Sequence, residues 1–302
     1  MSQTGTTGAQ APLGVLVDEV LERVDNLPTI STVSMRVGEL VNDPRADARQ
    51  IGEVMRQDPS LTAKVLRLVN SSYYAIPGGV SDVTRAIGFI GFNTLHQLVL
   101  SVSVLRSLRR EGFDSAALWL HSLAVGTCAE VVGRRIGHRD PGSCFTAGLL
   151  HDVGKVALAI TEPERFDSAL ARARTQGERM CEAERAAGLP THEQVGSRLA
   201  RRWRFPGPLL AAIQHHHDAA DPRVRRELAP ALLAIVDLVA VSDEICRHHA
   251  IGDGGSPAVD KVDPAALERL GLGPTHLDAI HTDLMRRLEL SKIFLELIDA
   301  TG

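Results

Sequence analysis

Apolar residues recur three or four positions apart along most of the 302-residue chain, and this spacing limits the fold more than any other feature. Leu16, Val20 and Val24 follow one another at four-residue intervals until Asn26 and Pro28 end the pattern. Such spacing places side chains on one face of a helix, whereas a half-buried strand alternates at every second residue. No segment alternates convincingly in that way, so the sequence predicts an all-α fold.

Helix start signals divide the chain into many helices. Asp47 is expected to cap one helix, Asp58-Pro59 begins another, and Thr191 with Gln194 forms a capping box. The main expected helices cover residues 29–41, 58–69, 82–108, 115–137, 143–160, 162–176, 180–187, 191–203, 208–217, 225–248 and 263 to the C-terminus.

The chain is expected to divide into three parts. Residues 1–12 are expected to form a disordered tail, residues 13–110 an N-terminal helical subdomain, and residues 111–302 a larger multi-helix bundle. Arg110-Glu111-Gly112 separates the two helical parts. Residues 252–257 are rich in Gly and are expected to form a mobile loop.

Charge and cysteine content exclude several classes of protein. The net charge of −4 argues against a general nucleic-acid or acidic-membrane binder, because both need a positive surplus. The four cysteines, at positions 128, 144, 181 and 246, form no C-x-x-C pair, which argues against a disulfide framework or a thiolate zinc site. The first ten residues lack the pattern of a signal peptide, and the longest apolar run, 98–105, is too short to span a membrane. We therefore expect a cytoplasmic protein without a membrane span.

His151-Asp152 is the first candidate for chemistry. Both residues are expected in the middle of a buried apolar helix, where an imidazole beside a carboxylate is costly unless a metal or hydrogen bonds compensate. With divalent ions, Asp152 can bridge two metals while His151 binds one. Gly148 and Gly154 flank the pair and suggest close packing or close approach to a ligand.

Two further polar residues interrupt apolar helical stripes and are expected to face inward. His121 follows Leu118 at a spacing of three, and Asp243 follows Val239 at a spacing of four. Asp237 competes with Asp243 for the same role but lies on no such clean stripe. A single inward histidine is usually a hydrogen-bonded core residue; the combination of four such residues favours a metal site.

Other polar clusters are open to two interpretations. His216 and His217 end one helix and His192 begins another, so they are either further ligands or solvated helix ends. Lys155, one turn after Asp152, is the better candidate for a phosphate contact. The basic cluster of 198–204 is either a solvated helix face or a phosphate-facing patch.

Short motifs recur along most of the chain: Leu27-Pro28, Asp58-Pro-Ser-Leu61, Leu66-x-Leu-Val-Asn-Ser71, Ala86-Ile-Gly-Phe-Ile-Gly91, Gly148-Leu-Leu-His-Asp152, His192-x-x-x-Gly196, Trp203-x-x-Pro206 and the paired histidines. Together these motifs resemble a known family, HDOD, the HD-related output domain. The resemblance runs from about residue 13 into the 240s.

The resemblance implies an all-helical, HD-like fold and a role in bacterial signal transduction. It also implies two divalent ions, of iron, manganese or a similar metal, with Asp152 and Lys155 as the catalytic pair if the site is active. The ligands that match are His121, His151, Asp152, His192, His216, His217 and Asp243. No Gly-Tyr-Pro loop follows His217, which argues against cyclic di-GMP hydrolysis, and Ala117 stands where some relatives use a glutamate for a third metal.

Two functions remain in competition. The first is a regulatory output protein that contacts a protein partner, with its N-terminal helical unit as the contact surface, and that is tuned by metal or by a nucleotide ligand. The second is an HD-type metal-dependent phosphodiesterase or phosphohydrolase acting on a nucleotide or a cyclic dinucleotide. Direct nucleic-acid binding is disfavoured by the acidic balance.

Overall fold

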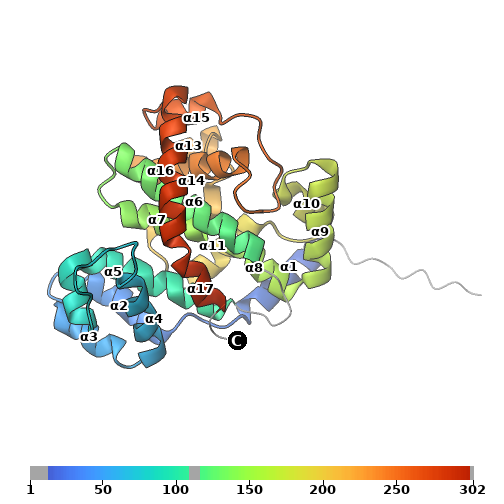
Figure 1. Cartoon of the computed structure of the whole chain (residues 1–302). Coiled ribbons are helices and arrows are strands. Elements are labelled where there is room, and N and C mark those ends of the chain that lie inside the picture. The colour runs from blue at the N-terminus through green and yellow to red at the C-terminus, as the bar shows by residue number, and fades with distance from the viewer. Residues whose placement is uncertain (1–12, 109–115, 300–302) are drawn as a thin grey trace, which may run out of the picture.

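The computed structural model describes residues 13–108 and 116–299, and the regular elements over these ranges are all helices (Figure 1). The expected all-α fold is confirmed. The expected tail, 1–12, and the expected boundary between residues 110 and 111 lie outside the described residues.

The helices are numbered in chain order, with one short 3-10 helix, η1. Their bounds are α1 Leu13–Asp25, α2 Thr32–Val41, α3 Ala48–Met55, α4 Pro59–Val69, α5 Val83–Ser107, α6 Ala116–Arg135, α7 Pro141–Leu150, α8 Val153–Thr161, α9 Pro163–Gln176, α10 Met180–Ala186, α11 His192–Arg202, α12 Gly207–His215, α13 Pro222–Glu227, α14 Pro230–His248, α15 Pro264–Arg269, η1 Pro274–His276, α16 Leu277–Ser291 and α17 Ile293–Asp299.

Capping residues account for several of these starts. The side chain of Asp47 accepts a hydrogen bond from the Gln50 amide at α3, and that of Asp58 accepts one from Leu61 at α4. Thr191 and Gln194 form the expected capping box at α11. These contacts satisfy amides that the first turn of a helix leaves without partners.

Helices α2 to α5 form one end of the molecule. Helices α6, α7 and α14 form the middle of the larger bundle at the other end (Figure 1). The first helix, α1, packs against α8 and α11 and not with the group formed by α2, α3, α4 and α5. Its buried Val20 and Val24 therefore contact the larger bundle. At the other end of the chain, α17 packs on α4, α5 and α6. One continuous cluster of buried apolar residues runs through both parts.

Helix α5 bends sharply at Gly91. This residue has φ +79° and ψ 167°, a conformation that favours glycine because it carries no Cβ. The bend redirects the second half of α5 toward α7, against which it packs. Helix α5 also forms one wall of a cavity that α7 lines on the opposite side.

Three stretches of the described residues are long and apolar enough to cross a membrane by length and composition: Val83–Ser107, Ala116–Arg135 and Pro141–Thr161. The expectation considered only the uninterrupted apolar run 98–105 and therefore underestimated the length of these stretches. Inside this fold, 56%, 83% and 89% of their most apolar windows are buried. Packing by neighbouring helices therefore accounts for the apolar character of the last two, because a helix that is hydrophobic on all sides can be buried by protein.

Candidate functional site

His151 and Asp152 lie at a break between two helices. The sequence predicted one helix over 143–160, but α7 ends at Leu150 and α8 starts at Val153. Asp152 has φ −98° and ψ 17°, outside the helical range, and caps α8 without a side-chain bond to it. Neighbouring side chains of a regular helix point in different directions, whereas the break lets His151 Nε2 and Asp152 Oδ2 approach to 3.2 Å.

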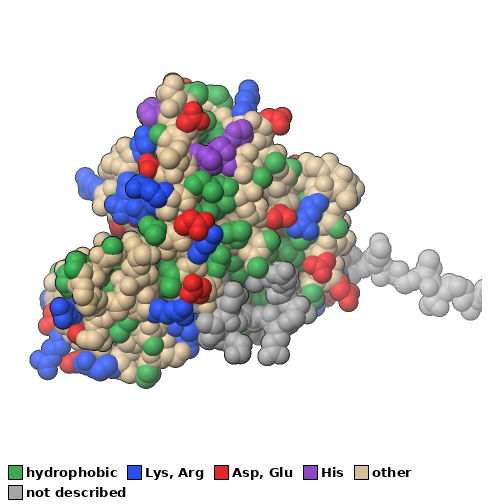
Figure 2. Space-filling view, viewed as in Figure 1, with side chains coloured by type: hydrophobic (Ala, Val, Ile, Leu, Met, Phe, Trp, Pro, Cys, Tyr) green, Lys and Arg blue, Asp and Glu red, His purple; other side chains and the backbone are tan. Residues whose placement is uncertain are grey.

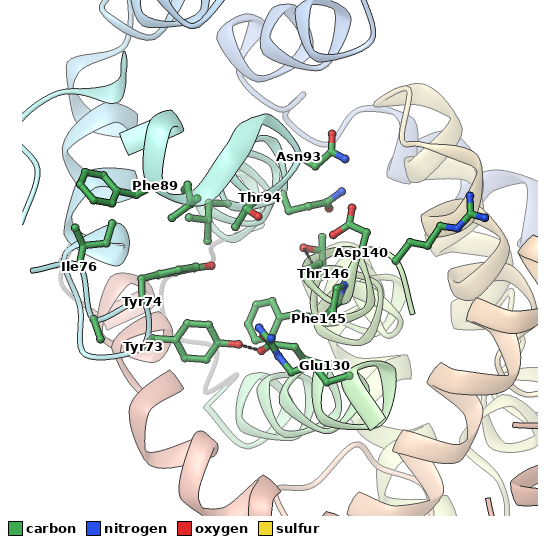
Figure 3. A pocket seen from close by; sticks show the side chains of 18 of the residues that line it. Tyr73, Tyr74, Ile76, Phe89, Asn93, Thr94, Glu130, Asp140, Phe145 and Thr146 are labelled. Carbon is green, nitrogen blue, oxygen red and sulfur yellow. Dashed lines mark hydrogen bonds and ion pairs between the residues drawn. The ribbon is translucent and has the colours of Figure 1, made fainter. Parts of the chain in front are cut away.

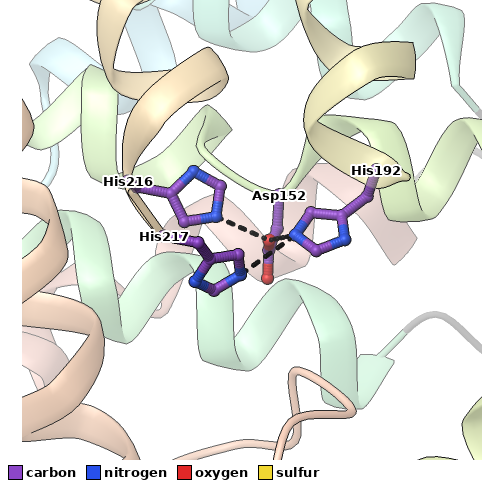
Figure 4. Close-up of side chains that lie close together, drawn as sticks. All are labelled: Asp152, His192, His216 and His217. Atoms are coloured by element: carbon purple, nitrogen blue, oxygen red, sulfur yellow. Dashed lines mark hydrogen bonds and ion pairs between the residues drawn. The ribbon is translucent and has the colours of Figure 1, made fainter. Parts of the chain in front are cut away.

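Asp152 is the hub of the site. Its Oδ1 lies 3.4 Å from His192 Nε2 and 3.6 Å from His216 Nε2. His217 completes this group, with its Nε2 3.1 Å from that of His192 (Figure 4). Asp152 Oδ2 accepts a 2.6 Å hydrogen bond from the Lys155 ammonium. The four residues that carry these imidazoles and this carboxylate could together hold a metal ion.

A second group adjoins the first through the other oxygen of Asp152. His121 Nε2 lies 3.1 Å from Asp243 Oδ1 and 4.0 Å from Asp152 Oδ2, and His151 is the third member. Asp237, the alternative to Asp243, lies elsewhere: Arg225 and Arg269 bind its carboxylate at 2.6 and 2.8 Å. The structure thus brings all seven predicted ligands and Lys155 together, from α6, the α7–α8 junction, the first turn of α8, α11, the end of α12 and α14. We call these eight residues the centre.

The imidazoles are oriented by their outward nitrogens. His151 Nδ1 donates to Gly148 O at 2.7 Å, and His216 Nδ1 donates to Ala212 O at 3.1 Å. Because a carbonyl can only accept, these rings carry their proton on Nδ1 and present an Nε2 lone pair to the centre. His192 Nδ1 contacts Glu184 at 2.9 Å, the carboxylate–histidine arrangement that supports metal-bound histidines.

Three buried polar atoms in the centre have no hydrogen-bond partner among the described residues: His151 Nε2, His216 Nε2 and Asp152 Oδ1. Leaving such atoms unpaired is costly. All three carry lone pairs of the kind that coordinate divalent metal ions. The donor set therefore fits a metal ion.

The charges agree with this conclusion. Four buried carboxylates, those of Asp152, Glu184, Glu193 and Asp243, face two cations, Lys155 and Arg247. Burial opposes ionisation of Asp152, but His151 and Lys155 outweigh it and hold the pKa of the carboxyl well below its usual range. Burial opposes protonation of His192, but Glu184 and Glu193 outweigh it and raise the pKa of its imidazole. The carboxylates still outnumber the cations, and a divalent cation would offset the remaining negative charge.

Sequence reasoning missed three contributors. Arg247 binds Asp243 at 2.9 Å, and its position one turn later on α14 was a usable signal. Glu193 follows His192 directly and lies 3.6 Å from its Nδ1. Glu184 gave no signal, since it reaches His192 from α10, a separate helix.

The basic cluster of 198–204 does not face the centre. Arg198 forms an ion pair with Asp25 at 2.5 Å, and Arg202 donates to the Leu27 carbonyl at 2.9 Å. Arg204 lies 3.6 Å from Glu39. The cluster therefore ties α11 to the first segments of the chain.

The segment 251–257, which we call the closing loop, covers the centre. Gly254 is buried, and its carbonyl accepts a 2.7 Å hydrogen bond from Lys155 Nζ. A Cβ on Gly254 would lie 2.6 Å from His121 Cδ2, closer than side chains approach. Arg174 also binds Asp253 at 2.5 Å. The loop that was expected to be mobile is thus packed against His121 and Lys155.

Gly254→Ala is expected to unseat the closing loop, because the added methyl overlaps the His121 ring. Overpacking of this kind costs about 1–3 kcal/mol, so amide exchange of residues 250–257 should accelerate about ten-fold or more, as read by hydrogen exchange with mass spectrometry. Gly273→Ala is the matched control, since a Cβ there meets nothing within 4 Å. Equal exchange in both variants would show that the loop is not held in place by this contact.

The family model described as HDOD domain matches residues 27–219. A crystal structure from Geobacter sulfurreducens, described as an HDOD domain protein with unknown function, is 27% identical, covers 94% of this chain and 97% of that chain, and has a TM-score of 0.75. One from Shewanella amazonensis SB2B, provisionally named a phosphohydrolase, is 23% identical over 91% of this chain and 97% of that chain, with a TM-score of 0.68, and supports the fold alone.

A curated relative extends beyond this chain. An uncharacterized protein of Treponema pallidum is 24% identical over 224 residues, which is 73% of this chain and 43% of the relative. The chain therefore spans less than half the length of the relative that it matches.

Proposed function

Because the chain belongs to the HDOD family, we propose that it is an output module of bacterial signal transduction that holds divalent metal in a closed centre. In this proposal it acts on a protein partner through helix contacts, with α2 to α5 as the contact surface. Turnover of a substrate is not part of the proposed role.

The main support for this proposal is that Lys155 is buried and that its ammonium already has two hydrogen-bond partners. Its side chain is 2% exposed, and its ammonium is already bound by Asp152 at 2.6 Å and by the Gly254 carbonyl at 2.7 Å. A phosphate would have to displace both contacts and the closing loop. The residue best suited to bind substrate is therefore used to hold the centre shut.

Metal would be held by the two groups, and Asp152 would serve both. Its Oδ1 would act with His192, His216 and His217, and its Oδ2 would act near His121, His151 and Asp243. A bound divalent ion supplies a Lewis acid that lowers the pKa of water. The chain's own contribution is orientation: Gly148, Ala212 and Glu184 fix the rings, and the closing loop excludes bulk water.

The competing function is a metal-dependent phosphohydrolase. The full set of seven ligand residues favours it, since a module that acts only by protein contacts has no need of them. In that case Asp152 and Lys155 would be catalytic, and the closing loop would have to open in each cycle.

The two functions predict different results with the purified full chain. We expect close to stoichiometric divalent metal by mass spectrometry, and no turnover of bis(p-nitrophenyl) phosphate or cyclic dinucleotides with added manganese or iron. Turnover that is lost in Lys155→Met, with metal retained, would replace our proposal by the hydrolase. A protein that binds no metal even when manganese or iron is supplied would contradict both.

A further inference from the structure

A cavity of about 550 Å³ lies between the two parts of the molecule, away from the centre (Figure 3). One side is formed by the turn after α4 and by α5, and the other by α6 and α7. Its volume is in the range of pockets that enclose small organic ligands. None of the residues of the centre lines it.

The walls of this cavity are aromatic. Tyr74, Phe89 and Phe145 line it, and Figure 3 shows the hydroxyl of Tyr74 directed into the open space. Phe89 is 54% exposed, the most exposed of the large hydrophobic side chains among the described residues. It lies two residues before the bend at Gly91, on the helix wall that faces Tyr74. Exposed and half-buried rings of this kind provide stacking surfaces for a planar ligand.

The same walls carry polar groups that the chain does not use. Tyr74 Oη and the side-chain amides of Asn93 and Gln97 have no hydrogen-bond partner within 13–108 and 116–299. Burial raises the pKa of Tyr74, which keeps its phenol protonated as a donor. An amide offers a donor and an acceptor side by side, the pattern with which proteins bind the edge of a nucleobase.

Positive charge borders the cavity. Arg139 lines it and has neither a hydrogen bond nor an ion pair among the described residues. Arg134 lines it too, and belongs to an adjoining arginine cluster with Arg135, Arg286 and Arg287. Among the residues that the structure describes, these four arginines share two carboxylates, Glu130 and Asp283. Lys and Arg side chains gather on this face over α7 and α16 (Figure 2).

We infer that this cavity binds a nucleotide. The base would stack between Phe89 and Tyr74 and be read by Asn93 and Gln97, and the phosphate would bind Arg139 beside Arg134. Guanidinium groups suit phosphate because they donate paired hydrogen bonds. The inference is independent of the metal centre, since the two sites share no residue. A ligand held by both parts of the molecule would fix their relative position.

The test is calorimetry on the full chain with AMP, GMP, CMP and UMP, and then with the two halves of the best ligand. We expect at least one nucleotide to bind, and its nucleoside and ribose 5-phosphate to bind at least ten-fold more weakly. Arg139→Gln should weaken binding about ten-fold or more, since a hydrogen bond to a charged group contributes about 1.5–3 kcal/mol. Asn93→Ala should weaken it about five-fold, since a hydrogen bond between neutral groups contributes about 1 kcal/mol. Arg226→Gln, an exposed arginine outside the cavity, is the control.

Three outcomes would overturn the inference. The first is no binding of any of the four nucleotides at millimolar concentration. The second is binding that Arg139→Gln and Asn93→Ala leave unchanged, which would place the nucleotide elsewhere. The third is ribose 5-phosphate binding as tightly as the nucleotide, which would show that the aromatic walls are not used. The variants alter exposed or half-buried side chains, so circular dichroism can verify that they fold.

Discussion

Gly154→Ala is expected to lower the free energy of unfolding by about 3 kcal/mol or more, the upper end of the cost of overpacking. A Cβ on Gly154 would lie 1.9 Å from the His192 carbonyl oxygen and 2.8 Å from the Gly196 nitrogen. Both are backbone atoms of α11, so no side-chain rotation can relieve the overlap and α8 and α11 must move apart. That movement also displaces His192 from Asp152, so we expect metal content to fall as well.

Gly88→Ala is the matched control for this prediction. Gly88 is an exposed residue of α5, and a Cβ there meets nothing within 4 Å. Alanine should stabilise that helix by up to about 1 kcal/mol. Urea unfolding followed by circular dichroism measures both variants. If Gly154→Ala proved as stable as Gly88→Ala and retained its metal, the close packing of α8 on α11 would be wrong.

Asp152→Asn is expected to reduce metal affinity at least about hundred-fold, because loss of a mere supporting partner already costs about 10–100-fold. Asp152 is a candidate ligand of one group, and its second oxygen lies 3.2 Å from His151 of the other group. Its loss also leaves Lys155 buried without a counter-charge, and breaking a buried ion pair costs about 3–5 kcal/mol. Metal titration and chemical unfolding measure the two effects separately.

Asp237→Asn separates a metal-binding role from a purely structural one. Asp237 is equally buried, lies on α14 and binds two arginines, but is outside the centre. This variant should lose stability and keep its metal. If Asp152→Asn does not fold, the double variant Asp152→Asn with Lys155→Met removes both charges and should fold without metal. Tight metal binding by either Asp152 variant would contradict the assignment of Asp152 as shared ligand.

Much of the fold could be predicted because its signals are local. Asp47, Asp58 and Thr191 cap helices where the sequence placed them, since a cap depends on residues within one turn. The break at His151-Asp152 could not be predicted in this way. Residues on both sides form apolar helices, and only the convergence of distant side chains on Asp152 explains the interruption.

The candidate site was predictable to a similar degree. A polar residue on an apolar stripe indicated that His121 and Asp243 face inward, and the structure places them 3.1 Å apart. The role of Glu184 and the position of the closing loop depend on which helices meet in space, and spacing along the chain carries no such information. Asp237 and Asp243 are both buried on α14; the apolar stripe favoured Asp243, and the structure places Asp243 beside His121 and Asp237 beside Arg225.

The placement of α1 has a mechanical consequence. This helix rests on α8, which starts just after Asp152 and carries Lys155, and on α11, which carries His192. Arg23 forms an ion pair with Glu162 at 2.5 Å, at the far end of α8, and Asp25 forms one with Arg198 of α11. A displacement of α1 would therefore act on both helices at once, and it would change the separation of Asp152 and His192.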